Sequence, residues 1–464
     1  MDDTQMSNST WNRRQFMDRA GLASAQLIGT ALLPGKGIAQ GVAAVKGSPK
    51  PVVIPTHEWA GDIDERLDFP DAWEINVLNM RGHDAPVITA EEIHKRVLAP
   101  IGTLPLRELA AGKKKVVVTF DDLTRGTPTF LVMPWVVEEL KAAGVADEGI
   151  LFIGSFGSHR PMTAIDIQKK IGKDIARRFA WVNHNVVSNF DEVGTTSFKD
   201  RILVNSTFMA ADLRVTVSGI RVHNDAGYGG GAKAVLPGVC ALDTNAYAHT
   251  VIAVPGNKTC GQVKIFKNEM RLNMIEAARL AKVGFSVQVL YNSKLRPTHV
   301  FAGDVVEAHH AACRVAAGHY CTPTMQKADV VVVNAYPLTA QAGLSQQWVG
   351  RSVRDGGTGV MILQHPLTLD PIHYVNQMTR GRRVHDYFSE LQSRQQRKLP
   401  NDTGLIVYSQ YLDRQMMNTY PTETQFAATW ADVIRLLQQR HKGDMRVAVY
   451  PYGGLQHQEV ELDG

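Results

Sequence analysis

The sequence has little cysteine, with four residues in 464. These residues, Cys240, Cys260, Cys313 and Cys321, lack the close paired spacing of a zinc site and are too few to staple a chain of this length. His309 lies one helical turn before Cys313, but the alanine-rich segment around them is typical of a packed helix. The cysteine pattern therefore excludes a disulfide-dense or zinc-ribbon scaffold and leaves a single disulfide open.

The sequence also lacks long apolar runs and blocks of one charge sign. Fifty Lys and Arg residues stand against 45 Asp and Glu residues, a net charge of +5, and no basic run occurs. A nucleic-acid-binding protein needs a concentrated basic surface, so the charge pattern argues against one. No segment is apolar enough for stable insertion into a membrane, which needs about 20 consecutive apolar residues.

The N-terminal segment has the pattern of an export signal. The letters "NRRQFM" at 12–17 precede a short apolar stretch and then "PGKGIAQG". Consecutive arginines before a moderately apolar stretch predict a twin-arginine signal peptide over 1–40, with an amphipathic anchor helix as the alternative. This signal predicts a soluble periplasmic protein that the twin-arginine export machinery carries already folded, with any cofactor loaded beforehand.

The remaining chain predicts an α/β fold. Short β-branched runs such as "KKVVVTF", "GILFIGSF", "LRVTVSGI" and "ADVVVVNAY" alternate with helix-length segments. This alternation is typical of parallel sheets covered by helices. We expect two α/β domains with mostly parallel sheets, at 41–315 and 322–455, and a cofactor or substrate cleft between them.

Three polar motifs follow predicted strands, where open α/β sheets bind ligands. "FDDLTRGTP" contributes Asp122 and Arg125, "IGSFGSHRP" contributes His159, and His223 follows the strand that ends near 219. An arginine can grip a carboxylate through two parallel hydrogen bonds, and histidine can exchange a proton near neutral pH. The alternative for each motif is structural: an Asp–Arg pair that stabilises a turn, or a packed histidine.

A glycine-rich loop, "GYGGGAKAVLPG" at 227–238, follows His223. It is not a Walker A loop, because Ala234 stands where a hydroxyl residue must follow Lys233. A dinucleotide fingerprint would need a strand, turn and helix and an acidic residue about twenty positions on, which this loop does not offer. A tight turn with a solvated lysine is the remaining ordinary interpretation.

Together these motifs resemble the nickel-pincer lactate racemases and their 2-hydroxyacid racemase and epimerase relatives. The similar stretches are D-L-T-R from Asp122, G-S-H-R around His159, V-H at His223, and G-G-A-K followed by P-G around Lys233. His249 stands sixteen residues after Lys233, the same step as in the family. The resemblance covers most of the chain after residue 40.

The resemblance implies a covalently attached nickel pincer nucleotide, a pyridinium-3-thioamide-5-thiocarboxylic acid mononucleotide. Lys233 would attach it, His249 would be the protein ligand of the nickel, and cofactor-maturation proteins would supply it. Gly230 and Gly231 would let the flat ring lie against the backbone with no Cβ in the way.

The resemblance also implies an isomerase. His159 and His223 would be the acid and base on the two faces of a 2-hydroxyacid, Arg125 would hold its carboxylate, and Asp122 would orient a histidine or the arginine. Hydride would leave Cα while a base takes the hydroxyl proton, and its return to the opposite face would invert the configuration.

The substrate pocket departs from the family pattern. The family's Y-Q-x-x-K glutamine and lysine fall at Leu344 and Gln347, so the lysine has no counterpart, while Arg221 brings a cation that the family lacks. This change makes lactate a weak assignment. Two alternatives stay open: a pincer enzyme of another hydride-shuttle reaction, and a non-catalytic periplasmic binding or cofactor-storage protein, which would not need His159 and His223.

Overall fold

The computed structural model describes residues 51–339, 342–366, 399, 402–412, 417 and 420–463. The predicted export signal at 1–40 lies outside these residues. Within them, no helix is long and apolar enough to cross a membrane.

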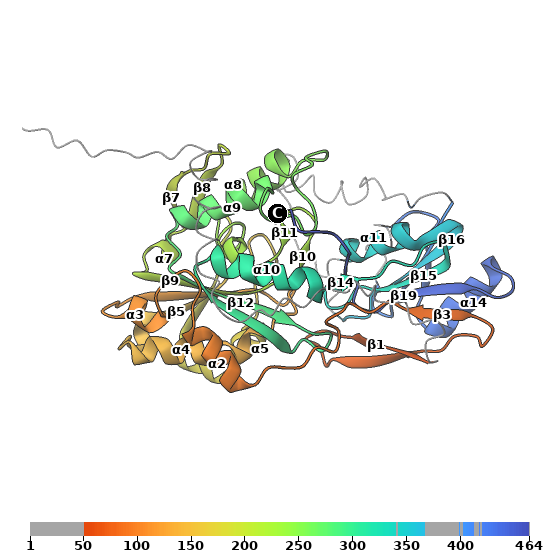
Figure 1. Cartoon of the computed structure of the whole chain (residues 1–464), viewed down its shortest axis with the longest axis horizontal. Coiled ribbons are helices and arrows are strands. Elements are labelled where there is room, and N and C mark those ends of the chain that lie inside the picture. Colours follow the sequence, from red (N-terminus) through yellow and green to blue (C-terminus); the bar gives the residue numbers. More distant parts are fainter. Residues whose placement is uncertain are drawn as a thin grey trace, which may run out of the picture.

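A first six-stranded sheet forms the centre of what we call the first unit (Figure 1). All neighbours are parallel except β12 and β13. In spatial order its strands are β13 (Pro297–Gly303), β12 (Phe285–Tyr291), β9 (Leu213–Gly219), β4 (Val116–Phe120), β5 (Ile150–Gly154) and β6 (Ala180–Asn183).

Alternation along the buried strands builds a core on each face of this sheet. On β4, Val116, Val118 and Phe120 pack into one core and Val117 into the other, because successive side chains point to opposite faces. The first core is covered by α2 (Ala90–Leu98), α3 (Leu106–Ala110), α4 (Met133–Ala142), α5 (Ala164–Ile171) and α6 (Lys173–Arg178), and the second by α7 (Ser206–Met209) and α9 (Glu269–Leu280).

Short elements complete the first unit. The hairpin of β7 (Phe190–Thr195) and β8 (Arg201–Asn205) and the hairpin of β10 (Val222–His223) and β11 (Gly227–Tyr228) are both antiparallel. They are followed by α8 (Leu242–Tyr247) and α10 (Glu307–His319), with a 3-10 turn at Gly231–Ala234 and a π-helical turn at Ala248–Ile252.

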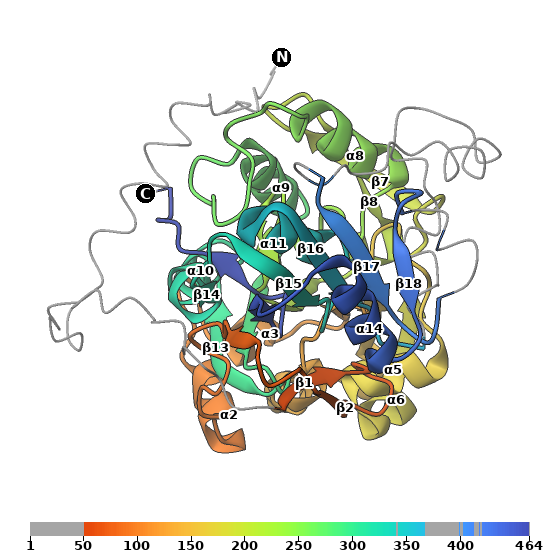
Figure 2. The same cartoon turned by 90° about the vertical axis from the view of Figure 1, so that its right-hand side faces the viewer.

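A second six-stranded sheet, entirely parallel, forms the second unit. Its helices α11 (Gly343–Ser352) and α14 (Trp430–Arg440) pack on opposite faces (Figure 2). Its strands in order are β18 (Gln425–Ala427), β17 (Gly404–Tyr408), β16 (Val353–Ile362), β15 (Ala328–Asn334), β19 (Arg446–Tyr450) and β3 (Glu74–Val77). The predicted α/β class with mostly parallel sheets is confirmed.

The second unit also takes in the start of the described chain. The hairpin of β1 (Val52–Thr56) and β2 (Ile63–Leu67) packs into the same core as β15 and β16, and β3 pairs with β19. Residues 52–77 therefore sit on the second sheet, although they fall in the 41–315 range predicted for the first domain.

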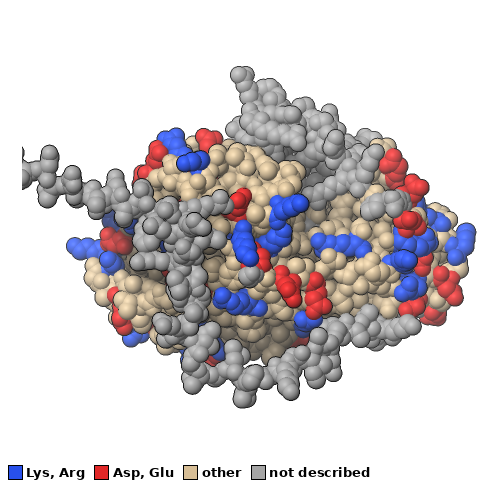
Figure 3. All heavy atoms as spheres, turned by 45° about the horizontal axis from the view of Figure 1, so that its top comes forward, with Lys and Arg blue, Asp and Glu red and all other residues tan. Residues whose placement is uncertain are grey.

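One cluster of buried residues joins the two units. Tyr228 and Tyr291 from the first unit and Tyr336, Tyr452 and Leu455 from the second share a core. The Tyr228 hydroxyl is 2.9 Å from Nε2 of His457 on the short strand β20 (His457–Gln458), which pairs with β14 (Cys321–Thr322). The four cysteines are all free. On the face drawn in Figure 3, basic and acidic side chains are interspersed.

Candidate active site

The predicted site residues of the first unit follow three neighbouring parallel strands, β5, β4 and β9. Asp122 and Arg125 come two and five residues after the end of β4, and His159 comes five after the end of β5. His223 lies four residues beyond β9, on β10. Because the carboxyl ends of parallel strands meet at one edge of a sheet, the fold brings these motifs together.

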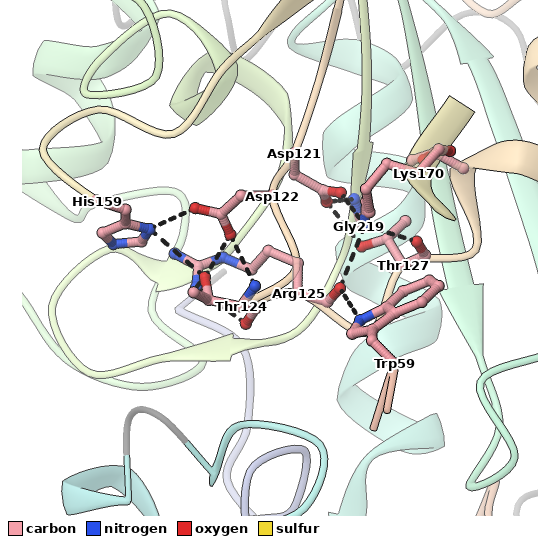
Figure 4. A network of polar contacts seen from close by, with 10 residues as sticks. Trp59, Asp121, Asp122, Thr124, Arg125, Thr127, His159, Lys170 and Gly219 are labelled. Atoms are coloured by element: carbon pink, nitrogen blue, oxygen red, sulfur yellow. Dashed lines mark hydrogen bonds and ion pairs between the residues drawn. The ribbon is translucent and has the colours of Figure 1, made fainter. Parts of the chain in front are cut away.

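Asp122 and His159 form a buried pair (Figure 4). Nδ1 of His159 lies 2.6 Å from Oδ2 of Asp122, and the Thr124 amide donates to Oδ1 over 2.9 Å. Burial opposes ionisation of Asp122, but the charge and hydrogen bond of His159 and the charge of Arg125 outweigh it and lower its pKa. The carboxylate therefore accepts the Nδ1 hydrogen and leaves Nε2 of His159 with a lone pair.

The pKa of His159 lies below its ordinary value. Burial lowers it most, and Asp122 opposes this effect, while the charges of Arg125 and Arg221 lower it further. At neutral pH His159 is therefore a neutral imidazole that can accept a proton, with a carboxylate in place to stabilise the resulting cation.

Arg125 is held beside this pair by contacts to its neighbours. Its Nη1 donates to Oγ1 of Thr124 over 2.6 Å, and its backbone carbonyl accepts from Nε1 of Trp59 over 3.1 Å and from Nζ of Lys170 over 3.2 Å. A second cation, Arg221, is fully buried, and desolvation lowers its pKa to about 9. The site thus concentrates positive charge where an acid would bind.

A buried ion pair of Lys170 and Asp121 lies next to the Arg125 backbone and was not predicted from the sequence. Nζ of Lys170, which has no solvent exposure, lies 2.7 Å from Oδ1 of Asp121 and donates to the Thr127 carbonyl over 2.8 Å. Asp121 Oδ2 also accepts the Thr127 hydroxyl and the Gly219 amide, a network visible in Figure 4. The two consecutive aspartates after β4 indicate a polar cluster at this place. Nothing in the sequence near Lys170 indicates that it pairs with Asp121.

His223 has the opposite hydrogen arrangement to His159. The backbone amides of Asp225 and Ala226 both donate to its Nδ1 over 3.2 Å. An amide can only donate, so Nδ1 is an acceptor and Nε2 carries the hydrogen. Burial, followed by the charges of Lys233 and Arg221, holds the pKa of His223 well below its ordinary value.

Lys233 and His249 complete the cluster. Burial, with the charges of Arg271 and Arg125 among others, holds the pKa of Lys233 well below its ordinary value, which favours a neutral amine. Nδ1 of His249 donates to the Asn245 carbonyl at 2.8 Å, so Nε2 keeps its lone pair. Burial and the charge of Lys233 lower the pKa of His249 to about 4.

These two residues fit the implied cofactor. A neutral lysine amine can form a covalent bond to an acyl-type group, and a neutral imidazole with a carbonyl partner on its other nitrogen is a typical metal ligand. Among the described residues no three His, Cys, Asp or Glu side chains are grouped for a metal. A lone histidine therefore suits a metal whose other ligands come from an organic group.

The turn itself requires the glycines of the loop, and their predicted contact with a cofactor stays a prediction. Gly230 and Gly231 have positive φ values of 76° and 59°. A Cβ on Gly230 would lie 2.5 Å from Oε1 of Gln288, and one on Gly231 would lie 2.6 Å from the ring of His309. The space beside these glycines is filled by protein, so they are needed for the turn and its packing, which in turn fixes Lys233.

Gln347 is the one predicted site residue in the second unit. It lies on α11 and lines a cavity that also includes Asn224, the residue after His223.

A comparison with known protein families matches a part of the chain that lies mostly in the first unit. Residues 61–261 match the family described as Lactate racemase N-terminal domain. The chain is 28% identical over 278 residues to the lactate racemase of Thermoanaerobacterium thermosaccharolyticum and 29% identical over 280 residues to that of Lactiplantibacillus plantarum. Each match covers 59% of this chain and 65% of the relative, slightly under two thirds of the relative's length.

Solved structures show a common fold. The lactate racemase apoprotein of T. thermosaccharolyticum superposes with a TM-score of 0.64 at 21% identity, covering 89% of this chain and all of that one. A protein of Thermotoga maritima superposes with a TM-score of 0.57 at 17% identity, covering 81% of this chain and 99% of that one. The chain therefore has the lactate racemase fold, and its residues 61–261, which hold every predicted site residue except Gln347, match the Lactate racemase N-terminal domain family.

Proposed function

We propose that this protein is a racemase or epimerase of a 2-hydroxyacid that carries a nickel pincer nucleotide on Lys233. The observation that carries the proposal is the grouping of two neutral histidines, His159 and His223, with a buried lysine and a metal-competent histidine, His249. Lys233 and His249 are electrostatic neighbours of His223, and Lys233 and His159 are electrostatic neighbours of His249. The family match of residues 61–261 supports the same reaction class.

The cofactor would be held by two side chains. Lys233 would form its thioamide bond, and Nε2 of His249 would bind the nickel together with donors that the organic group provides. When bound, this group supplies a reversible hydride acceptor, a chemistry that no amino-acid side chain offers.

The protein's own residues would bind the acid and move its proton. Arg125 would hold the carboxylate, and Nε2 of His159 would take the hydroxyl proton as the Cα–H bond breaks. Asp122 would stabilise the imidazolium that forms. The product of this half-reaction is a planar 2-oxoacid, which Arg125 would keep in place while its carbonyl turns to the other face.

His223 would serve that second face. In its present arrangement Nε2–H of His223 would donate a hydrogen bond to the carbonyl oxygen of the 2-oxoacid. To give up a proton and remain neutral, His223 must first be protonated at Nδ1, and the amides of Asp225 and Ala226 must then turn away. Proton return on this face is therefore coupled to a small movement of the loop that leads to Lys233.

The test is intact mass, nickel content and racemisation of 2-hydroxyacids on full-length protein from a host that makes the cofactor. We expect an adduct on Lys233, about one nickel per chain, and loss of optical rotation from a single enantiomer. His159→Ala and His223→Ala should abolish turnover and keep adduct and nickel.

Two further variants separate the cofactor roles. Lys233→Arg keeps a long nitrogen-bearing side chain but cannot form the adduct, whereas His249→Ala should keep the adduct and lose most of the nickel. An unmodified Lys233 in protein from a host shown to make the cofactor would overturn the proposal.

We also propose that residues 1–40 direct the folded, cofactor-loaded chain to the periplasm through the twin-arginine machinery, after maturation proteins have supplied the cofactor. Replacing Arg13 and Arg14 by lysine should leave the protein in the cytoplasm, as measured by cell fractionation.

A further inference from the structure

A cavity of about 380 Å³ lies where α11 meets the segments that follow His223. Asn224 and Gln262 of the first unit and Gln347 and Arg351 of the second contribute polar side chains to its wall. Nε2 of Gln262 donates to Oδ1 of Asn224 over 2.9 Å, and Nη2 of Arg351 donates to Oε1 of Gln262 at 3.5 Å. The hydrogen bonds of the wall thus run from Arg351 to the neighbour of a proposed catalytic histidine.

Two donors in this wall have no acceptor. Nη1 of Arg351 and Nε2 of Gln347 are buried and make no hydrogen bond within the described part of the chain. The two residues are four apart on α11, so they share one face of the helix. A buried donor without an acceptor is unfavourable, and a ligand that brings an acceptor removes that cost.

Arg351 also carries a positive charge that makes no ion pair with a carboxylate among the described residues. Its guanidinium lies 5.5 Å from the centre of the Trp348 ring, which fixes the side chain. Among the described residues its electrostatic neighbour is the phenol of Tyr450 and not a carboxylate. A guanidinium beside an amide matches a carboxylate, which accepts several hydrogen bonds.

We propose that this cavity is a second carboxylate subsite, in which Arg351 and Gln347 bind the distal carboxylate of a dicarboxylic 2-hydroxyacid. The inference rests on the proposed function, because Arg125 and the two histidines would hold the reacting end. The volume agrees, since pockets of about 300–1,000 Å³ hold ligands well above three carbons. Arg351 also supplies a positive charge one helical turn after Gln347, the position at which the resembling family has a lysine.

The experiment compares lactate, malate and 2-hydroxyglutarate as substrates of the cofactor-loaded, full-length protein. We expect Arg351→Met, which keeps the side-chain length over Trp348, to raise KM for the preferred dicarboxylate about ten- to hundredfold more than KM for lactate. Arg351→Lys should recover part of the loss. Arg435→Met is the matched control, because Arg435 is exposed on α14 and pairs with Asp432; it should leave both KM values unchanged.

The outcomes separate the two proposals. If lactate is racemised and Arg351→Met changes KM for both kinds of acid alike, or for neither, the subsite is overturned and the proposed function stands. If protein with the adduct and nickel racemises none of the acids, the proposed function fails. Calorimetric binding of 2-hydroxyglutarate then decides the subsite: loss of binding in Arg351→Met supports it, and equal binding overturns it.

Discussion

At the residue scale, the site depends on which nitrogen of each histidine carries hydrogen. His159 gives its Nδ1 hydrogen to Asp122, whereas His223 receives two amide hydrogens at Nδ1. The two rings are therefore unlike: one is ready to accept a proton at Nε2, and the other is ready to donate a hydrogen bond there.

Asp122→Asn tests this difference. The amide cannot stabilise the His159 cation, so we expect kcat to fall about a hundredfold or more with little change in KM. Asp122 raises the pKa of His159, so its loss lowers that pKa further and moves the acid limb of the rate profile, already below about 6.5, to lower pH. The measurement is kcat/KM against pH, with Asp147→Asn as control, because Asp147 is a half-buried carboxylate that pairs with Lys141 and Arg178 outside the site. An unshifted acid limb would contradict the assigned role.

Asp200 gives a pH dependence of stability that is independent of catalysis. Burial raises its pKa to about 7, against a hydrogen bond from Asn273. The unfolded value lies near 3.9, so this group's contribution to stability is complete below about pH 4 and is lost as pH rises through 7. Between pH 5 and 8 the free energy of unfolding of the wild type should therefore fall further than that of Asp200→Asn, by about 1 kcal/mol or more. The measurement is denaturant unfolding at several pH values. An equal fall in the free energy of unfolding of the two proteins would refute this prediction.

The sequence predicts candidate site residues more readily than their surroundings, and the roles of those residues stay predictions. Strand ends and the spacing from His223 to Lys233 to His249 are local features, and the charges of these three residues do act on one another in the structure. Trp59 and Lys170 contact Arg125 from remote parts of the chain, so no local pattern could reveal them. The sequence does not tell where a Cβ on Gly230 or Gly231 would point, and in the structure it would meet Gln288 or His309.

At the element scale, the loop between β1 and β2 connects the second unit to Arg125. Its residues His57, Trp59 and Asp62 all have positive φ, which non-glycine residues adopt at a cost. Trp59 meets the first unit twice, through its hydrogen bond to the Arg125 carbonyl and through its ring, 4.9 Å from Nζ of Lys170. Strain at this loop is thus offset by contacts that fix Arg125.

Trp59→Phe removes one donor and keeps an aromatic ring. We expect KM for the 2-hydroxyacid to rise about three- to tenfold, the loss of one hydrogen bond, with a smaller change in kcat. Trp181→Phe is matched to it, because Nε1 of Trp181 also donates to a backbone carbonyl over 3.1 Å, that of Ala176. Equal effects of the two substitutions on KM would show that Trp59 does not position Arg125.

At the scale of the whole molecule, the two units share one buried cluster around Tyr228, Tyr291 and Tyr336. The division at 41–315 and 322–455 stays a prediction, and the pairing of β3 with β19 shows why a sequence cannot draw it simply. A prediction of domain boundaries from sequence assumes a single linker. Here the chain forms β3 of the second sheet, continues through the first unit and returns to the second sheet at β15.

Thermal unfolding tests the coupling of the units. Because Leu455 is fully buried in the shared cluster, Leu455→Ala should destabilise the protein by about 2–5 kcal/mol. We expect calorimetry to show one transition in the wild type and one, at lower temperature, in the variant. Two separate transitions in the wild type would mean that the units unfold independently.

The pairing of β3 with β19 also has a consequence for synthesis. Ile75 faces Val447 across the edge of the second sheet, so β3 cannot pair until the ribosome has made β19, far later in the sequence. At about 5–20 residues per second, that wait lasts tens of seconds. During it the apolar residues of 52–77 have no second sheet to cover them, so we expect chaperones to bind the nascent chain until β19 has been made.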